Sequence, residues 1–306
     1  MTKLWPAVLV FLLWSFFAII VHEFASDSIF GDCAISHHQQ NTKQGLKAST
    51  AKKSVQPTDQ HNIQPFAIKN TLGETLFNFP KGFVTNNLNG NVKIPEEIAS
   101  FKDSVYDYLN KNQEKELRIT GKYLNSEVNL KEGTNFANSR IQHIKNILIV
   151  AGVNPDRVIP KIKVSRYEYD QNGEYNNGIL LEFQNINDEN LAKIEEGISN
   201  KTLYSNFAVK EFKPDRKLES YTIELKNYLQ KYPHKKVYIV GHTDSVGVNN
   251  DQFGLDRANN VKDYLITQGI SEAILEVSSK GENKPIATNK TEEGRAKNRR
   301  IEITIK

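Results

Sequence analysis

Two isolated charges of opposite sign lie near the end of the sequence, in the stretch VGHTDSVGVNNDQFGLDRANNVKDYL (240–265). Asp244 follows the apolar run 237–240, and Arg257 lies where a new helical pattern begins. A carboxylate accepts hydrogen bonds from an ammonium group, and a guanidinium donates two parallel hydrogen bonds to a carboxylate. Held apart, these two side chains could bind a zwitterion, whereas in direct contact they would form a salt bridge between loop and helix. The rest of the sequence decides between these interpretations.

The chain contains an internal repeat that surrounds this pair. The segments 98–121 and 218–241 align without gaps, and their apolar residues form the same helical stripe. Each predicted helix is followed by a β-rich run that ends in glycine, ELRITG (116–121) or KVYIVG (236–241). A second predicted helix in each copy ends at Gly152 or Gly269, and an alternating strand closes the copy, at 179–183 or 300–305.

This order of strands and helices predicts a sheet covered by helices in each copy, which is an α/β two-layer sandwich. We therefore expect two tandem βαβαβ domains, at 66–187 and 200–306. Residues 188–199 are expected to form the linker between them.

An apolar segment without charges, residues 4–21, predicts a transmembrane helix or signal anchor within residues 1–23. Lys3 precedes the segment and the first lysine after it is Lys43, so the remaining chain is expected outside the cytoplasm. A cleaved signal peptide is the alternative. Residues 24–65 are polar and lack apolar periodicity, which predicts a flexible linker.

Composition and motifs exclude several classes of function. The net charge of +4 is too small to indicate nucleic-acid binding, and the single cysteine, Cys33, permits no intrachain disulfide. His37 and His38 have no second ligand cluster at a fixed spacing, so we expect no metal site and no cofactor. The sequence has neither a G-x-S-x-G elbow nor a nucleotide-binding loop, so we do not expect an enzyme.

The second copy resembles the OmpA-like C-terminal domain, the peptidoglycan-binding module of outer-membrane anchors, Pal-type lipoproteins and MotB-type stators. Three motifs carry the resemblance: GHTD (241–244), NDQFGLDRA (250–258) and GENKPIATNKTEEGRAKNRRIEI (281–303). It departs from the family in a shorter loop between Asp244 and Asn250, and in Phe253 and Gly254, which replace the usual Leu and Ser.

The resemblance implies that Asp244 and Arg257 grip the diaminopimelate side chain of the cell-wall peptide. It also implies that Thr243 and Asn250 support the loop, and that arginines at 299 and 300 lie near the site. Because alternate strand residues face opposite ways, we expect one of Arg299 and Arg300 to contribute.

The first copy departs further from this pattern. Leu124 stands where the second copy has Asp244, whereas Arg140 aligns with Arg257. Glu127 lies three positions after Leu124, in a loop of different length. We therefore expect the first copy to be a degenerate OmpA-like domain without the usual ligand site, which acts as a spacer or contacts an envelope partner. A ligand site of another kind is the alternative.

Together these patterns predict a non-catalytic envelope protein that binds peptidoglycan and tethers the cell wall to a membrane through its N-terminal helix. We expect an inner-membrane anchor with the bulk in the periplasm; a cleaved signal would leave the protein periplasmic or associated with the outer membrane. A stator is excluded because residues 4–21 contain no ionisable side chain to carry protons. An envelope scaffold that does not bind peptidoglycan is the alternative function.

Overall fold

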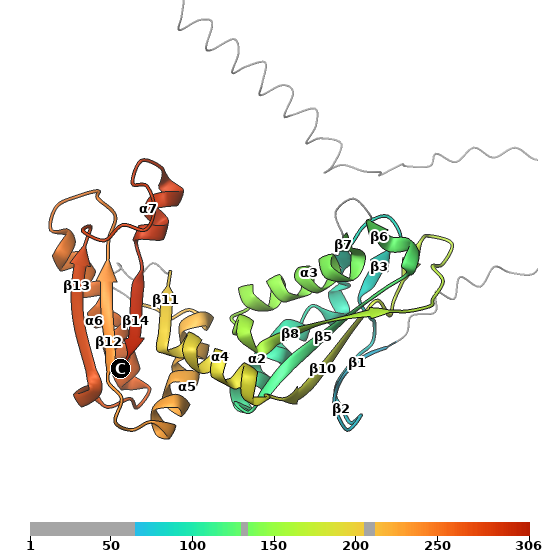
Figure 1. The fold of residues 1–306 in the computed structure, drawn as a ribbon, viewed down its shortest axis with the longest axis horizontal. Helices are drawn as coiled ribbons and strands as arrows, with labels where there is room; N and C mark the ends of the chain where they lie inside the picture. Colours follow the sequence, from blue (N-terminus) through green and yellow to red (C-terminus); the bar gives the residue numbers. More distant parts are fainter. Residues whose placement is uncertain (1–64, 130–133, 205–211) are drawn as a thin grey trace, which may run out of the picture. The chain divides into compact units, whose positions relative to one another are not determined.

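The computed structural model describes residues 65–129, 134–204 and 212–306. Two sheets, each with its own helices and hydrophobic core, make up most of this part (Figure 1). This arrangement confirms the predicted α/β two-layer sandwich. The expected membrane segment at 1–23 and nearly all of the linker at 24–65 lie outside the described residues. Within the described ranges, no helix has the length and apolar character needed to cross a membrane.

The first sheet has five strands in the order β2-β1-β10-β5-β8. Their bounds are Phe66–Asn70 for β1, Thr75–Phe79 for β2, Lys115–Tyr123 for β5, Val158–Val164 for β8 and Ile179–Asn185 for β10. Helices α2 (Phe101–Lys111) and α3 (Phe136–Val150) contribute to the same core. Successive strand residues point to opposite faces, so Leu117 and Ile119 of β5 are buried while Arg118 between them is partly exposed.

Short elements complete the first domain. Strands β3 (Val84–Asn86), β4 (Val92–Lys93) and β9 (Glu174–Tyr175) form a three-stranded sheet, and β6 (Val128–Asn129) pairs with β7 (Thr134–Asn135). Three 3₁₀ turns lie between the larger elements: η1 (Glu96–Ile98), η2 (Asn125–Glu127) and η3 (Pro155–Arg157).

The second sheet has four strands in the order β11-β14-β12-β13. Their bounds are Asn200–Leu203 for β11, Val237–His242 for β12, Leu275–Gly281 for β13 and Ile301–Ile305 for β14. Helices α5 (Arg216–Lys231) and α6 (Asn250–Thr267) supply buried residues to its core, η4 (Glu272–Ile274) precedes β13, and the short α7 (Glu292–Asn298) precedes β14. Ile301, Ile303 and Ile305 alternate with polar residues and face this core.

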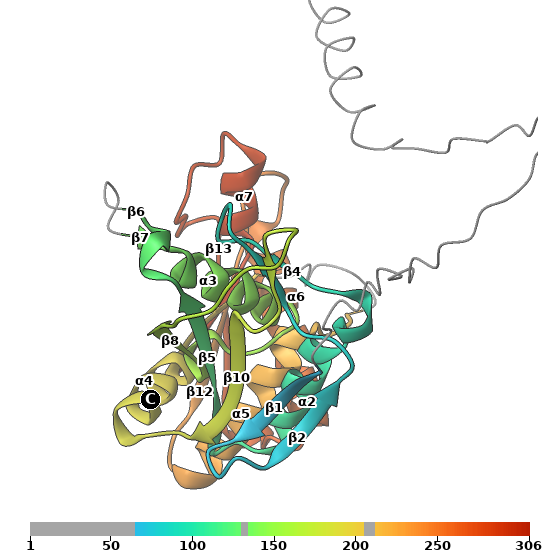
Figure 2. The same cartoon turned by 90° about the vertical axis from the view of Figure 1, so that its right-hand side faces the viewer.

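The same arrangement of three neighbouring strands occurs in both sheets. In both, the strand after the first long helix pairs antiparallel with the closing strand and parallel with the strand after the second long helix (Figure 1). Figure 2 shows the three strands of the first sheet, β8, β5 and β10, side by side. They differ at the next position, where β1 runs parallel to β10 but β11 runs antiparallel to β14. The sequence patterns above assign no strand to β8 or β13, which are edge strands with several exposed residues.

Residues 188–199, expected to link the domains, form helix α4 (Asp188–Ser199). The side chain of Asn187 caps the helix by accepting a hydrogen bond from the Asn190 N–H at 2.8 Å. Ile194 and Ile198, four residues apart and thus on one face, are buried in the core of the second domain. This apolar pair explains why the stretch packs as a helix although most of its residues are polar.

Candidate functional site

The place of Arg257 depends on a close approach between helix α6 and strand β12. A Cβ added to Gly241 would overlap the carbonyl oxygen of Gly254, and one added to Gly254 would overlap the Ser279 hydroxyl. Helix α6 therefore lies directly against the end of the strand at Gly254, and this backbone contact leaves no room for a side chain at Gly241. Arg257, one turn after Gly254, is carried to the carbonyl of His242. The replacement of the family's usual serine by Gly254 thus has a steric explanation.

Helix α6 begins with an unusual residue. Asn249 has φ of 61°, in the left-handed region that asparagine adopts more readily than most residues. Asn250, the first residue of the helix, donates from Nδ2 to Glu282 Oε2 at 2.5 Å. This bond joins the start of α6 to the loop after β13.

Asp244 is 7% exposed, and both of its carboxylate oxygens accept hydrogen bonds. Oδ1 accepts from the Val246 N–H at 3.0 Å, which shapes the loop, and Oδ2 accepts from Arg299 Nη1 at 2.6 Å. Arg299 also donates from Nη2 to Glu292 Oε1 at 2.6 Å. Hydrogen bonds to Asp244 and Glu292 together raise the pKa of Arg299.

Arg257 is 8% exposed and donates from Nη1 to the carbonyl oxygen of His242 at 3.0 Å. Burial lowers the pKa of Arg257, and the nearby charge of Asp244 opposes that shift. Among the described residues, Asp244 forms its ion pair with Arg299 rather than with Arg257. The direct salt bridge considered as the alternative to ligand binding is therefore not formed between Asp244 and Arg257.

Two polar side chains next to Asp244 are buried without hydrogen-bond partners among the described residues. Thr243 is 4% exposed; its N–H donates to the Gly281 carbonyl at 2.9 Å, but its hydroxyl has no partner. Neither ring nitrogen of His242 makes a hydrogen bond, although Nε2 lies 3.4 Å from Glu302 Oε2. Burial, followed by the charge of Arg300, lowers the pKa of His242, and Glu302 acts in the opposite sense. A buried hydroxyl without a partner is costly, which makes Thr243 a candidate ligand contact.

The two consecutive arginines have different surroundings. Arg299 faces Asp244, whereas Arg300 is 2% exposed, donates from Nε to Glu302 Oε1 at 2.7 Å and from Nη2 to the Lys284 carbonyl at 3.1 Å. Consecutive residues that enter a strand point to opposite sides. The side chain of Arg299 therefore reaches Asp244, whereas that of Arg300 holds the loop before β14.

Asn298 is a supporting residue that the site prediction did not include. Its fully buried side chain accepts from the N–H groups of Ile286 at 2.8 Å and Ala287 at 3.0 Å, and donates to the Ala287 carbonyl at 2.9 Å. These bonds fix the loop that delivers Arg299 to Asp244. The spacing of residues does not predict this role. The only indication in the sequence is that Asn298 lies within the third OmpA-like motif, residues 281–303.

Asp244, Arg257 and Arg299 together hold two positive charges and one negative charge in a largely buried position. Arg257 has five N–H donors, and the described residues accept one of its hydrogen bonds. Such a group can bind the carboxylate of a ligand through arginine and its ammonium through Asp244.

Residues 207–299 match the model of the OmpA family. The peptidoglycan-associated lipoprotein of Buchnera aphidicola subsp. Baizongia pistaciae is 33% identical over 138 residues, which cover 44% of this chain and 77% of that protein. The peptidoglycan-associated lipoprotein of Pseudomonas aeruginosa is 37% identical over 106 residues, covering 33% of this chain and 60% of the relative. The fold and these matches define the second domain as an α/β domain of the kind described by this family model. The chain belongs to the OmpA family.

Other relatives are similar over a smaller part of their length. The outer membrane porin F of Pseudomonas fluorescens is 37% identical over 83 residues, and these cover 26% of each protein. The chain thus spans about a quarter of that relative, and the family match at 207–299 lies within the range expected for the second domain.

Proposed function

We propose that this protein is a non-catalytic component of the cell envelope that binds peptidoglycan through its second domain. One observation carries the proposal: Asp244 and Arg257 are both more than nine-tenths buried and lie close enough to interact electrostatically, yet they are not each other's ion-pair partners. A buried arginine with remaining donors next to a buried carboxylate suits a ligand that carries both charges.

The distal end of diaminopimelate has this chemistry, because an ammonium and a carboxylate share one carbon. Its carboxylate would accept from Arg257 and from the Thr243 hydroxyl, which has no other partner among the described residues. Its ammonium would donate to Asp244, whose oxygens retain acceptor capacity beyond the bonds from Val246 and Arg299. The specificity for diaminopimelate is part of this proposal.

The remaining parts of the proposal concern the rest of the chain. The segment 4–21 would anchor the protein in the inner membrane, with the bulk in the periplasm, so that the chain tethers the membrane to the cell wall. The first domain would be a degenerate OmpA-like repeat, supported by the strand arrangement that it shares with the second domain. It would act as a spacer or contact an envelope partner.

Sedimentation with purified peptidoglycan sacculi tests the binding site. Asp244→Ala and Arg257→Ala should each reduce retention of the full-length chain. Two control variants match these changes: Asp256→Ala removes an exposed acid of α6, and Arg118→Ala removes an arginine of the first domain that pairs with Glu182. Equal retention of site and control variants would favour the alternative, an envelope scaffold that does not bind peptidoglycan.

Soluble wall peptides test the ligand chemistry. A tripeptide ending in meso-diaminopimelate should compete with sacculi, whereas the same tripeptide with lysine lacks the distal carboxylate and should compete poorly. Comparable competition by both peptides would show that Arg257 does not bind the distal carboxylate. The N-terminal sequence of the mature protein separates the localisations, because a start beyond residue 22 rules out an uncleaved anchor.

A further inference from the structure

The first domain holds an arginine in the same backbone setting as Arg257. Arg140 Nη1 donates to the carbonyl of Lys122 at 2.6 Å, just as Arg257 Nη1 donates to the carbonyl of His242 at 3.0 Å. Each carbonyl belongs to the residue that follows the glycine near the strand end, Gly121 or Gly241. Both domains therefore bring a buried guanidinium to the equivalent strand end.

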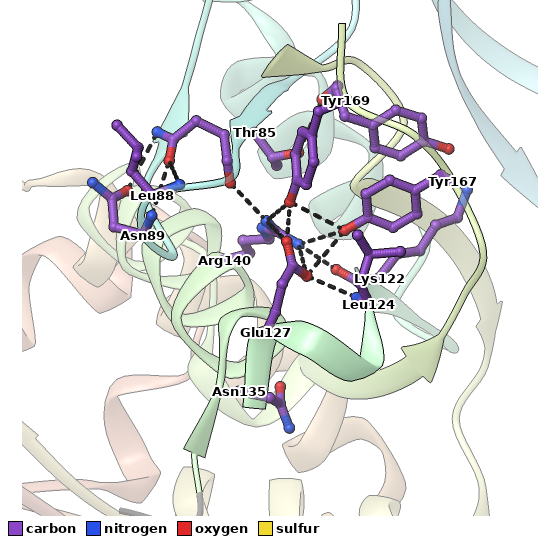
Figure 3. A network of polar contacts seen from close by, with 12 residues as sticks. Thr85, Leu88, Asn89, Lys122, Leu124, Glu127, Asn135, Arg140, Tyr167 and Tyr169 are labelled. Atoms are coloured by element: carbon purple, nitrogen blue, oxygen red, sulfur yellow. Dashed lines mark hydrogen bonds and ion pairs between the residues drawn. The ribbon is translucent and has the colours of Figure 1, made fainter. Parts of the chain in front are cut away.

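The surroundings of the two arginines then differ. Glu127 reaches Arg140 with both carboxylate oxygens: Oε1 lies 3.1 Å from Nη2, and Oε2 lies 3.3 Å from Nη1 (Figure 3). The side chains of this pair are 0% and 5% exposed, for Arg140 and Glu127 respectively. Two-point contact of this kind is how arginine binds a carboxylate ligand.

The carboxylate of Glu127 is also held by groups other than the arginine. Oε2 accepts from the Leu124 N–H at 2.8 Å and from the Tyr167 hydroxyl at 3.1 Å, and Oε1 accepts from the Tyr169 hydroxyl. Figure 3 shows both tyrosine hydroxyls directed at the Arg140–Glu127 pair. A guanidinium, a backbone N–H and two hydroxyls converge on one carboxylate, which is a set of donors suited to an anion.

We propose that the donor groups around Arg140 form a carboxylate-binding site that the chain fills with its own Glu127. Occupied in this way, the site takes no carboxylate from outside. Leu124, which stands where the second domain has Asp244, contributes its backbone N–H to the internal carboxylate and offers no acceptor for an ammonium. The inference concerns the first domain and does not rest on the proposed function.

Removal of the internal carboxylate should open the site to a small free one. In Glu127→Ala, Arg140 stays buried without its charged partner, so the folded state loses stability. Acetate would replace the missing carboxylate in the folded protein and not in the unfolded chain, so it would raise the melting temperature of this variant.

The test compares melting temperatures of the full-length chain in sodium acetate and in sodium chloride at equal ionic strength. Glu127→Ala should melt lower than the wild type in chloride and should gain several degrees more from acetate than the wild type does. The matched control is Glu182→Ala, which removes the acid of another arginine pair, Arg118–Glu182 at 2.8 Å, where the acid's side chain is 36% exposed. This control should respond to acetate as the wild type does.

A double variant, Arg140→Ala with Glu127→Ala, identifies the group that binds acetate. It should lose the additional acetate response, because the guanidinium is gone. Equal acetate responses in Glu127→Ala, Glu182→Ala and the wild type would overturn the proposal, and so would a full response in the double variant. If Glu127→Ala does not fold in chloride, recovery of folded protein on refolding in acetate supports the proposal, and failure to recover overturns it.

Discussion

Asp244→Asn separates a ligand-binding role from a purely structural one, because it keeps the shape of the side chain and removes its charge. An asparagine oxygen can still accept from the Val246 N–H, as Oδ1 of Asp244 does at 3.0 Å. Its amide group would then face Arg299 Nη1, which lies 2.6 Å from Oδ2, so a charged hydrogen bond is replaced by two opposing donors.

The contacts of Asp244 determine how much stability and how much ligand affinity Asp244→Asn should lose. The side chain of Arg299 is 33% exposed and keeps its bond to Glu292, so loss of the Asp244 pair should cost about 0.5–1 kcal/mol of stability. For a domain of about 100 residues, that cost corresponds to a fall in melting temperature of roughly 2–8 °C. A charge-assisted hydrogen bond from a ligand ammonium to Asp244 is worth about 1.5–3 kcal/mol, so affinity should fall roughly 10- to 100-fold.

Both quantities can be measured on the same preparations, by thermal melting and by equilibrium binding of a diaminopimelate-containing wall peptide. A structural role for Asp244 alone predicts the small fall in melting temperature with unchanged affinity. A dissociation constant within twofold of the wild type, in a variant that shows this fall, would refute the ligand role.

Three further predictions concern the same region. Arg257→Lys keeps the charge but loses the fork that can bind a carboxylate at two points, so wall-peptide affinity should fall at least about tenfold in equilibrium binding; unchanged affinity would contradict that geometry. Asn298→Ala removes a fully buried side chain that makes several loop hydrogen bonds, and urea unfolding should show a loss of about 2–4 kcal/mol; a loss below 1 kcal/mol would mean that the loop is held otherwise. Burial lowers the pKa of His242 in the folded state below its ordinary value of 6.5. As the pH falls through 6.5, His242 is therefore protonated in the unfolded chain before it is protonated in the folded protein. The stability that neutral His242 contributes is thus complete well above pH 6.5 and is lost as the pH falls. The decrease in unfolding free energy between pH 7.5 and 5 should therefore be smaller in His242→Asn than in the wild type. An equal decrease in both proteins would contradict the lowered pKa of His242.

The long helices α2, α3, α5 and α6 and the closing strands β10 and β14 could be predicted because their apolar residues repeat with clear periods, whereas α4 was expected to be a linker. In α5, Leu218, Tyr221 and Leu225 are all buried on one face, as their spacing indicates. Edge strands gave no such signal. In β8 only Val158 is fully buried and the residues toward Val164 are exposed, so the strand forms through pairing with β5 rather than through an apolar pattern.

Individual partners within the site were harder to predict than the residues themselves. The motifs indicated Asp244, Arg257 and one of the two arginines Arg299 and Arg300, but which arginine pairs with Asp244 depends on how the chain enters β14. The pairing of Glu127 with Arg140 was hidden because the intervening loop differs in length between the domains, so alignment places Leu124 opposite Asp244. Contacts of this kind arise from tertiary structure and leave no local pattern.

Helix α4 and strand β11 have a mechanical consequence for the proposed tether. Tension from the N-terminal side enters the second domain through α4, where Ile194 and Ile198 are buried in the core, and continues into β11, which pairs with β14 at four positions from Asn200 to Leu203. A pull along the chain therefore meets buried side chains and a strand pair before it reaches α5. Tension would thus act on the packed core of the domain, and substitution of Ile194 or Ile198 should lower the force that the domain resists.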